Sequence, residues 1–263
     1  MSYNTKVIAI AAQKGGVGKT ATTINLGVAL AQMGYKVLLI DCDNHPSLSI
    51  RMGIQQPDTL EDTLASILTK TIEGQAVLAS DGIIHHEEGV DFVPSSTRLA
   101  NVEMALATAD CRERYLAEYI EIVRGSYDYV LLDCLPSIGL IAINALTAAD
   151  EVLLVTKADF DSAKGMENLL VSIKRVQRKL NPSLAISGAL ITMVDLRTRD
   201  ANETIDMLKA AYGAHLRFFD IMISASVKAR EAGKYGISIH KHAPDNSVAL
   251  AYADLAKEVS GCE

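Results

Sequence analysis

The sequence predicts an α/β fold in which a mostly parallel, twisted β-sheet carries helices on both faces. Short apolar runs rich in β-branched residues alternate along the chain with longer segments of helical periodicity. In these runs apolar and polar residues do not alternate, as they would in a strand with one face exposed to solvent. The runs therefore indicate strands that are buried on both faces. They occupy residues 7–12, 37–40, 90–93, 129–132, 152–155 and 186–191.

The helices between these strands carry end signals that can be read from the sequence. Residues 20–33 form a helical pattern that Gly34 closes, and residues 137–148 form a second one. Residues 162–180 form a long amphipathic helix that Asn181 and Pro182 stop. We expect these helices to cover the sheet. Residues 54–89 are polar with mixed helical signals, and we interpret them as helical decoration.

Length and composition favour a single domain over residues 1–263. Hydrophobic residues make up 49% of the 263 residues, so the chain can bury a large core. There is no apolar run of about eighteen residues and no signal-peptide pattern, which predicts a soluble, cytoplasmic protein without a membrane partner. The four cysteines form no CxxC pair, which argues against a zinc ribbon or a redox dithiol.

A glycine-rich segment follows the first predicted strand directly and leads into the first helix. Glycines in such a loop let successive backbone N–H groups point at phosphate oxygens, and the helix N-terminus adds a favourable dipole. In this pattern Lys19 neutralises the β- and γ-phosphates of a nucleotide, and the Thr20 hydroxyl ligates Mg²⁺. A glycine-rich turn that binds nothing is the alternative, and the strand–loop–helix context argues against it. The predicted nucleotide-binding residues are Lys14, Gly15, Gly16, Val17, Gly18, Lys19, Thr20 and Ala21.

The loop departs from the ordinary phosphate-loop pattern, because Gln13 stands where the first glycine would be and Lys14 adds a second lysine. In this respect it resembles the deviant Walker A motif of the ParA/MinD/nitrogenase-iron-protein ATPases. The resemblance implies that Lys14 and Lys19 are both catalytic. Lys14 would act in trans, on the phosphates of the partner subunit in an ATP-bound homodimer. A solvated loop lysine is the alternative for Lys14.

Two further predicted strands end in carboxylates, at the edge where open α/β sheets bind ligands. Asp41 and Asp43 follow residues 37–40, and Asp133 follows residues 129–132. By resemblance to the same ATPases, Asp43 is a catalytic residue that positions or deprotonates the attacking water. Asp133 then holds Mg²⁺ through water, and Asp41 belongs to the outer magnesium shell. Strand-end capping or turn formation is the alternative role for these acids.

Within this superfamily the chain resembles the ParA/Soj branch of partition ATPases over nearly its whole length. The tail at residues 255–263 lacks the basic amphipathic membrane helix of MinD-like proteins. Three departures limit what the resemblance implies: Asn44, His45 and Pro46 replace Pro-Gln-Gly, Leu135 replaces a proline, and residues 155–157 replace a Pro-Val-Gln segment that lies near the nucleotide in relatives. We interpret His45 as an incidental loop histidine, and we assign no base-contacting residue. The blocks that carry the resemblance are residues 25–27, 133–137, 144–150 and 253–259.

The resemblance also implies binding to duplex DNA without sequence preference, through basic residues in the C-terminal third. Arg197 and Lys228 stand where relatives carry arginines, and Arg230 is an additional charge, whereas Ala225 replaces an arginine. A net charge of −7 argues against binding by bulk charge, so a local basic face would be needed. Ordinary solvated surface is the alternative for these side chains.

Together these expectations describe an ATP-dependent switch for plasmid or chromosome partition. ATP and Mg²⁺ close a homodimer, the dimer holds nucleoid DNA, and hydrolysis stimulated by a ParB-like partner releases it, with slow intrinsic turnover. Two alternatives stay open. The first is a ParA-like ATPase that positions a protein cargo or regulates conjugation or division without binding DNA. The second is a metabolic P-loop enzyme that uses ATP to modify a small substrate.

Overall fold

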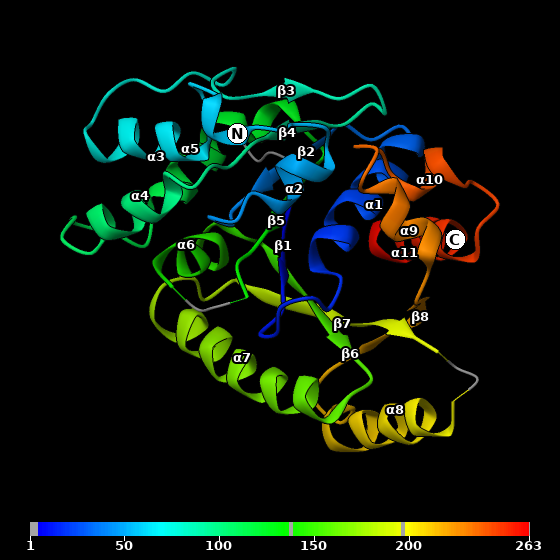
Figure 1. Ribbon diagram of the computed structural model, residues 1–263. Coiled ribbons are helices and arrows are strands. Elements are labelled where there is room, and N and C mark those ends of the chain that lie inside the picture. The colour runs from blue at the N-terminus through cyan, green and yellow to red at the C-terminus, as the bar shows by residue number, and fades with distance from the viewer. Residues whose placement is uncertain (1–4, 137–138, 196–197, 263) are drawn as a thin grey trace.

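The strands of the computed structural model form one eight-stranded sheet in the order β3-β4-β2-β5-β1-β6-β7-β8 (Figure 1). The structure describes residues 5–136, 139–195 and 198–262, without the side chains of residues 160, 161, 163 and 200. Neighbouring strands run parallel, except that β3 runs antiparallel to β4. The strands are β1 Lys6–Ala11, β2 Val37–Asp41, β3 Ile84–His85, β4 Asp91–Val93, β5 Tyr129–Asp133, β6 Glu151–Lys157, β7 Ala185–Val194 and β8 Phe218–Ser224.

The helices lie on both faces of this sheet, which confirms the predicted fold class. No helix in the described part of the chain combines the length and apolarity that a membrane crossing requires. The helices are α1 Lys19–Gln32, α2 Ser47–Arg51, α3 Leu64–Ile72, α4 Leu99–Leu106, α5 Tyr115–Val123, α6 Leu140–Ala148, α7 Phe160–Lys179, α8 Arg199–Tyr212, α9 Val227–Ala232, α10 Ile239–His242 and α11 Ser247–Ser260, with 3₁₀ turns at Pro57–Thr59 and Arg124–Ser126.

Every strand predicted from the sequence is present, with ends that differ by a few residues, and so are the predicted helices now labelled α1, α6 and α7. The predicted start of α6 at Ser137 lies outside the described residues. Residues 54–89 are part of the folded core and do not only decorate its surface, because α3 buries Leu64, Ile67 and Leu68 completely. The same stretch also contains strand β3, which the sequence analysis missed.

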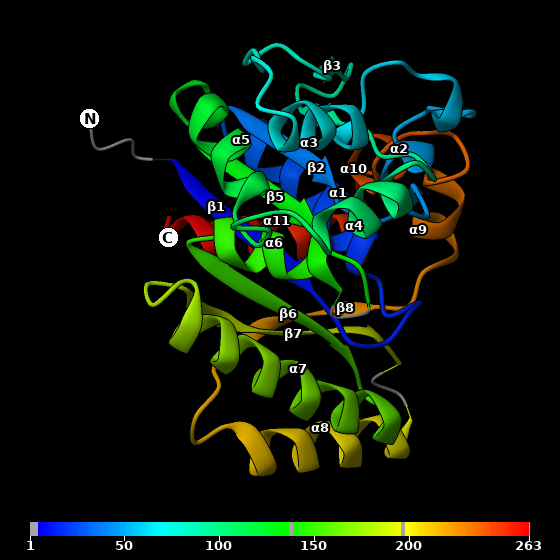
Figure 2. The same cartoon turned by 90° about the vertical axis from the view of Figure 1, so that its left-hand side faces the viewer.

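Successive side chains of each buried strand point to opposite faces of the sheet and pack into two separate cores, one on each face. Val7 and Ala9 of β1 pack with α5, α6 and α7, whereas Ile8 and Ile10 pack with α1 and α11. Figure 2 shows α6 and α7 in front of the strands with α11 behind them. The uninterrupted apolar strand pattern arises because both faces of each central strand are covered.

Close contact between α1 and the sheet depends on Gly27. A Cβ atom at this position would lie 2.5 Å from the Leu39 side chain of β2, too near for two carbon atoms. The missing side chain therefore lets α1 pack directly on the strands, which fixes the N-terminus of this helix relative to the sheet.

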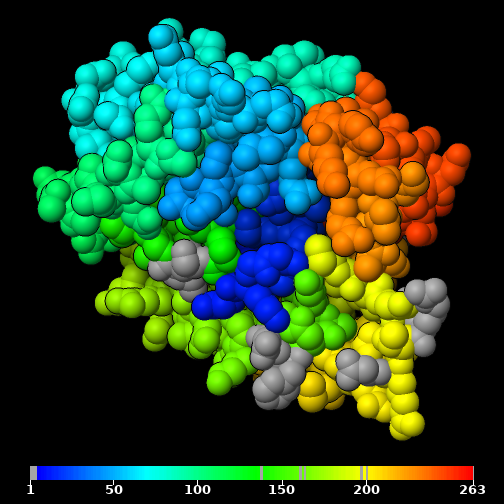
Figure 3. Space-filling view, in the orientation of Figure 1, coloured from blue at the N-terminus to red at the C-terminus, as the bar shows by residue number. Residues whose placement is uncertain are grey.

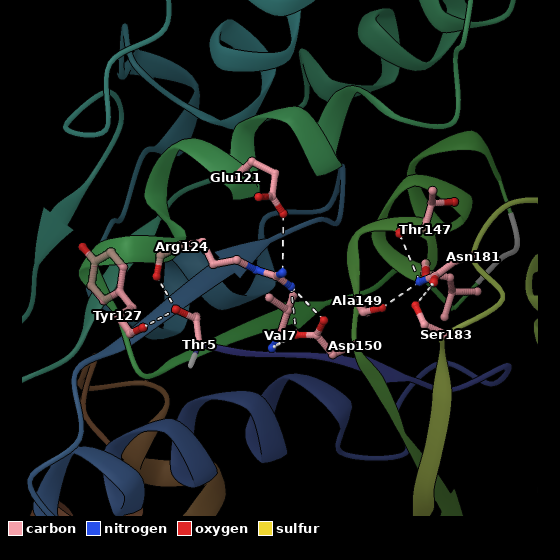
Figure 4. A network of polar contacts seen from close by, with 11 residues as sticks. Thr5, Val7, Glu121, Arg124, Tyr127, Thr147, Ala149, Asp150, Asn181 and Ser183 are labelled. Atoms are coloured by element: carbon pink, nitrogen blue, oxygen red, sulfur yellow. Dashed lines mark hydrogen bonds and ion pairs between the residues drawn. The ribbon is translucent and has the colours of Figure 1, made fainter. Parts of the chain in front are cut away.

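Polar contacts tie together the amino ends of the central strands, on the side of the sheet away from the phosphate loop (Figure 4). Arg124 Nη2 lies 2.8 Å from Asp150 Oδ1, and Asp150 Oδ2 accepts a hydrogen bond from the Val7 backbone N–H at 2.8 Å. Asn181 Nδ2 donates to the carbonyls of Thr147 and Ala149, at the C-terminal end of α6. These contacts occupy the amino edge, so the carboxyl edge is left for ligands.

Candidate nucleotide-binding and catalytic site

A cavity of about 870 Å³ opens at the carboxyl ends of the strands, and the predicted phosphate loop lines it. Figure 3 shows the dark blue loop region at the centre of this face, bordered on one side by the orange segment that contains α9. Of the predicted nucleotide-binding residues, Val17 is the exception, because it is buried and packs in the core under the loop. The predicted residues that line the cavity are Lys14, Gly15, Gly16, Gly18, Lys19, Thr20 and Ala21.

The loop conformation requires glycine at two positions. Gly16 and Gly18 have φ angles of 71° and 91°, in the left-handed region that residues with a Cβ avoid. Gly18 is the N-cap of α1, which carries no side-chain cap, so the first N–H groups of the helix are available to an anion. The Thr192 hydroxyl of β7 contacts the carbonyl of Val17, which anchors the loop to the sheet.

Lys19 and Asp133 form a buried ion pair beneath the loop. Lys19 Nζ lies 3.0 Å from Asp133 Oδ1, with 8% and 0% of the two side chains exposed. Burial lowers the pKa of Lys19, but the Asp133 carboxylate outweighs burial and raises the pKa above its ordinary value, so the ammonium stays charged. To reach a β- or γ-phosphate, this ammonium must share or leave its contact with Asp133.

One carboxylate oxygen of Asp133 fits a metal held through water. Among the described residues Asp133 Oδ2 is buried without a hydrogen-bond partner, which is uncommon for a charged acceptor. A water molecule on Mg²⁺ could donate to this oxygen, and Mg²⁺ keeps several waters when it binds beside phosphates. Thr20 lines the adjoining cavity at the start of α1, where the predicted hydroxyl ligand belongs. The predicted magnesium role of Thr20 and Asp133 therefore suits the residues present.

Asp41 lies beside Asp133 because the two residues are register partners in β2 and β5. Asp41 Oδ2 accepts hydrogen bonds from the backbone N–H and the hydroxyl of Ser49, at 2.9 and 2.7 Å. Burial, helped by the charge of Asp133, raises the pKa of Asp41 to about 7. Asp41 thus fixes α2 to the end of β2, in addition to the outer-shell magnesium role predicted for it.

The buried Asp41 should make stability fall with rising pH. Its folded-state pKa of about 7 exceeds the unfolded value, so its contribution is complete below the unfolded pKa and is lost as pH rises through 7. Asp41→Asn removes this titration. We expect the parent, without magnesium, to lose a few kcal/mol of unfolding free energy between about pH 4 and pH 7 relative to the variant. Urea unfolding across this range measures the difference, with the exposed Asp254→Asn as control. Parallel pH profiles of parent and Asp41→Asn would contradict the assignment.

Of the predicted strand-end carboxylates Asp41, Asp43 and Asp133, Asp43 is the one that lines the cavity. Its Oδ1 accepts a hydrogen bond from the His45 backbone N–H at 2.9 Å, which orients the side chain. Burial raises the pKa of Asp43, which brings the group closer to the range in which a general base works well. The imidazole of His45 is 90% exposed at the rim of the cavity, and its Nδ1 lies 3.8 Å from Asp43 Oδ1.

Lys14 lies at the edge of the cavity rather than inside it. Its Nζ is 3.3 Å from Asp159 Oδ1, and its side chain is 41% exposed. Asp159 caps the N-terminus of α7 by accepting from the Ser162 backbone N–H at 2.7 Å. The second lysine of the loop is therefore held near the surface, whereas Lys19 is buried.

The wall beside the loop, built from β7, β8 and α11, consists of residues that the sequence analysis did not assign. Met193 has a φ angle of 54°, at a register shift between β7 and β8, and this conformation turns the end of β7 along the cavity. The Tyr252 hydroxyl lies 3.3 Å from Thr22 Oγ1 of α1, so α11 closes the wall from behind. The wall is mostly apolar, as suits a nucleotide base. It contains Thr192, Met193, Ile223, Ser224, Ala225, Val248 and Tyr252.

The basic residues predicted to contact DNA separate in the structure. Arg230 lines the nucleotide cavity, whereas Lys228 is 56% exposed on the same helix and pairs with Glu231 at 3.1 Å. Arg197 lies outside the described residues. The structure thus places one of these charges beside the nucleotide site and another on the outer surface.

A phosphate loop between β1 and α1, a buried lysine, and carboxylates at the ends of β2 and β5 define a P-loop nucleotide-binding protein. Comparison with known sequences agrees with this class. The family described as an AAA domain matches residues 5–186. The chain is 36% identical over 255 residues to the sporulation initiation inhibitor protein Soj of Bacillus subtilis, covering 97% of this chain and 98% of Soj. It is also 36% identical over 259 residues to the chromosome partitioning protein ParA of Caulobacter vibrioides, covering 97% and 93%.

The fold is shared with a solved enzyme structure. Cobyrinic acid a,c-diamide synthase from Mycobacterium smegmatis, with bound ADP and magnesium, superimposes with a TM-score of 0.83 and 29% identity. The match covers 96% of this chain and 93% of that enzyme. From these similarities, the chain belongs to the ParA/MinD family of P-loop ATPases. Within that family it is of the ParA/Soj type, as its sequence motifs predict.

Proposed function

We propose that this ATPase is a dimerising switch for chromosome or plasmid partition. It binds ATP and Mg²⁺, dimerises, and binds duplex DNA of the nucleoid without sequence preference. A ParB-like partner stimulates ATP hydrolysis, and the protein then releases the DNA. The observation that carries the proposal is the different position of the two loop lysines. Lys19 is buried against Asp133, whereas Lys14 stands at the cavity edge, where a second subunit could present its nucleotide.

In this proposal each residue of the site has one task. The N–H groups of the loop and of α1 hold the phosphates, and the Lys19 ammonium moves from Asp133 toward them. Bound Mg²⁺ would neutralise phosphate charge beside Thr20 and Asp133. Asp43 orients a water molecule from its position in the cavity wall and accepts its proton. Lys14 of the partner subunit completes the positive charge around the phosphates.

The 36% sequence identity to ParA, over 97% of this chain, favours a role in partition over the metabolic alternative, although a biosynthetic enzyme shares the fold. Partition requires ATP-dependent DNA binding, and protein positioning does not. The deciding experiment is retention of two unrelated duplexes with ATP, with ADP and without nucleotide. Retention of both duplexes in the ATP state alone supports partition. An ATP dimer that fails to bind either duplex at low salt would favour the protein-positioning alternative.

We expect Lys228 to supply one phosphate contact per subunit, because it is exposed on α9 in the segment that resembles the DNA-binding region of ParA proteins. Lys228→Ala should weaken DNA binding equally for all sequences. Because the change removes one phosphate contact from each subunit of the dimer, the slope of log K against log salt should flatten by about 1.8. A salt series measures this slope, and Arg175→Ala on α7 serves as the control. An unchanged slope would remove Lys228 from the DNA contact and leave Arg197 as the proposed contributor, because Arg230 lines the nucleotide cavity.

A further inference from the structure

The two sides of the nucleotide cavity carry side chains of opposite charge. Glu103 of α4 and Arg230 of α9 both line the cavity. Figure 1 shows α4 and α9 on opposite sides of the molecule, with α2 and the start of α1 between them. Within the described residues neither side chain has a hydrogen-bond or ion-pair partner. An acidic edge and a basic edge thus flank the same opening.

Packing holds both edges in place. The Glu103 carboxylate packs against Gly139, where a Cβ atom would collide with it, and Gly139 is the N-cap of α6. At the basic edge, Arg51 of α2 also lines the cavity, and its Nη1 lies 2.7 Å from the position of a Cβ on Gly233. Gly233 is the C-cap of α9, three residues after Arg230, so Arg51 packs against the helix that carries Arg230. Two arginines therefore line this edge of the cavity.

Each charged edge also exposes a large apolar side chain. Met104, next to Glu103, is 75% exposed, and Val227, at the start of α9, is 59% exposed. A single exposed apolar residue is ordinary, but Val227 lines the cavity next to the unpaired charge of Arg230, which is typical of a surface that becomes covered. The covering surface must offer a base to Glu103 and an acid to Arg230.

We propose that these two edges pair with each other across the ATP dimer, so that Glu103 of one subunit meets Arg230 of the other, beside Arg51. A second copy of this chain is the partner that offers both charges, whereas nucleic acid would be repelled by Glu103. In a two-fold symmetric dimer the contact occurs twice, because the same two edges meet at both ends of the interface. The pairing closes both nucleotide cavities. It rests on the proposed ATP-dependent dimer and adds the contacts that fix its register.

The test uses charge reversal in two separate variants, E103R and R230E. Each variant homodimer contains two like-charged contacts, so its ATP dimer should be at least about tenfold weaker than that of the parent. An equimolar mixture forms heterodimers with one native pair and one reversed pair. These heterodimers should regain affinity to within about threefold of the parent. Energy transfer between labelled subunits, with a slowly hydrolysed ATP analogue, measures each dimer.

Arg175→Glu on α7 is the control, because it makes the same charge change away from the cavity, and it should leave the dimer unchanged. If E103R does not fold, Glu103→Gln mixed with R230E replaces it, and partial restoration is expected. Homodimers as tight as the parent, or a mixture no tighter than its components, would overturn the pairing while the dimer stands. Weaker ADP binding by monomeric R230E would also overturn it, since Arg230 would then serve its own subunit's nucleotide. A parent that does not dimerise with the analogue would refute the proposed function itself.

Discussion

Replacing Asp43 by asparagine is expected to lower partner-stimulated ATP hydrolysis by about a hundredfold or more while the ATP dimer still forms. Asp43 faces the cavity, and the His45 backbone N–H holds its Oδ1 in place. Asparagine can keep that hydrogen bond but cannot accept a proton from water. The phosphate loop, Lys19 and Asp133 are untouched, so nucleotide binding should change little.

Phosphate release with DNA and the partner present measures this loss, and light scattering with ATP shows whether the dimer accumulates. His45→Ala is the matched control, because its imidazole is exposed and the backbone contact to Asp43 survives the change. It should hydrolyse ATP at nearly the parental rate. If Asp43→Asn releases phosphate as fast as the parent, another residue activates the water.

Lys19→Ala should reduce affinity for ADP and ATP by at least about tenfold, since it removes the buried charge next to the phosphate site. The same change leaves Asp133 as an uncompensated carboxylate with no exposure, beside Asp41. Breaking a buried pair in this way typically costs about 3–5 kcal/mol of stability, so unfolding must be measured with binding.

Asp133→Asn separates the two effects, because it keeps Lys19 and frees it from its partner. In the absence of magnesium this variant should bind ADP at least as tightly as the parent, since no ion pair has to be exchanged. Isothermal titration in a chelating buffer makes the comparison. Near-parental nucleotide affinity in a folded Lys19→Ala protein would mean that the lysine does not contact the phosphates.

The sequence predicted the parts of the site that depend on local spacing. The loop between β1 and α1 could be found because glycines at fixed offsets follow a buried strand, and the observed φ angles of Gly16 and Gly18 give the reason for that spacing. Asp41 and Asp133 could be placed at one edge of the sheet because parallel strands end on the same side.

The cavity wall formed by β7, β8 and α11 depends on long-range topology and could not be predicted. Strand β8 was missed because it is a half-exposed edge strand, in which Asp220 interrupts the apolar run. Without β8 there was no reason to bring residues 223–225 next to the loop. Nor does any local signal show that Asp41 binds Ser49 or that Arg230 reaches the cavity.

We propose that ATP joins two subunits into a dimer through Lys14, which contacts the nucleotide of the partner subunit. The mass of the protein in solution tests this most directly. Light scattering should show a dimer with a slowly hydrolysed ATP analogue and magnesium, and a monomer with ADP or without nucleotide. Lys14→Ala should remain a monomer with the analogue, although it binds nucleotide with nearly the parental affinity, because Lys14 lies at the cavity edge, away from the buried Lys19–Asp133 pair. A Lys14→Ala protein that dimerises as tightly as the parent, or a parent whose mass does not depend on the nucleotide, would contradict the account.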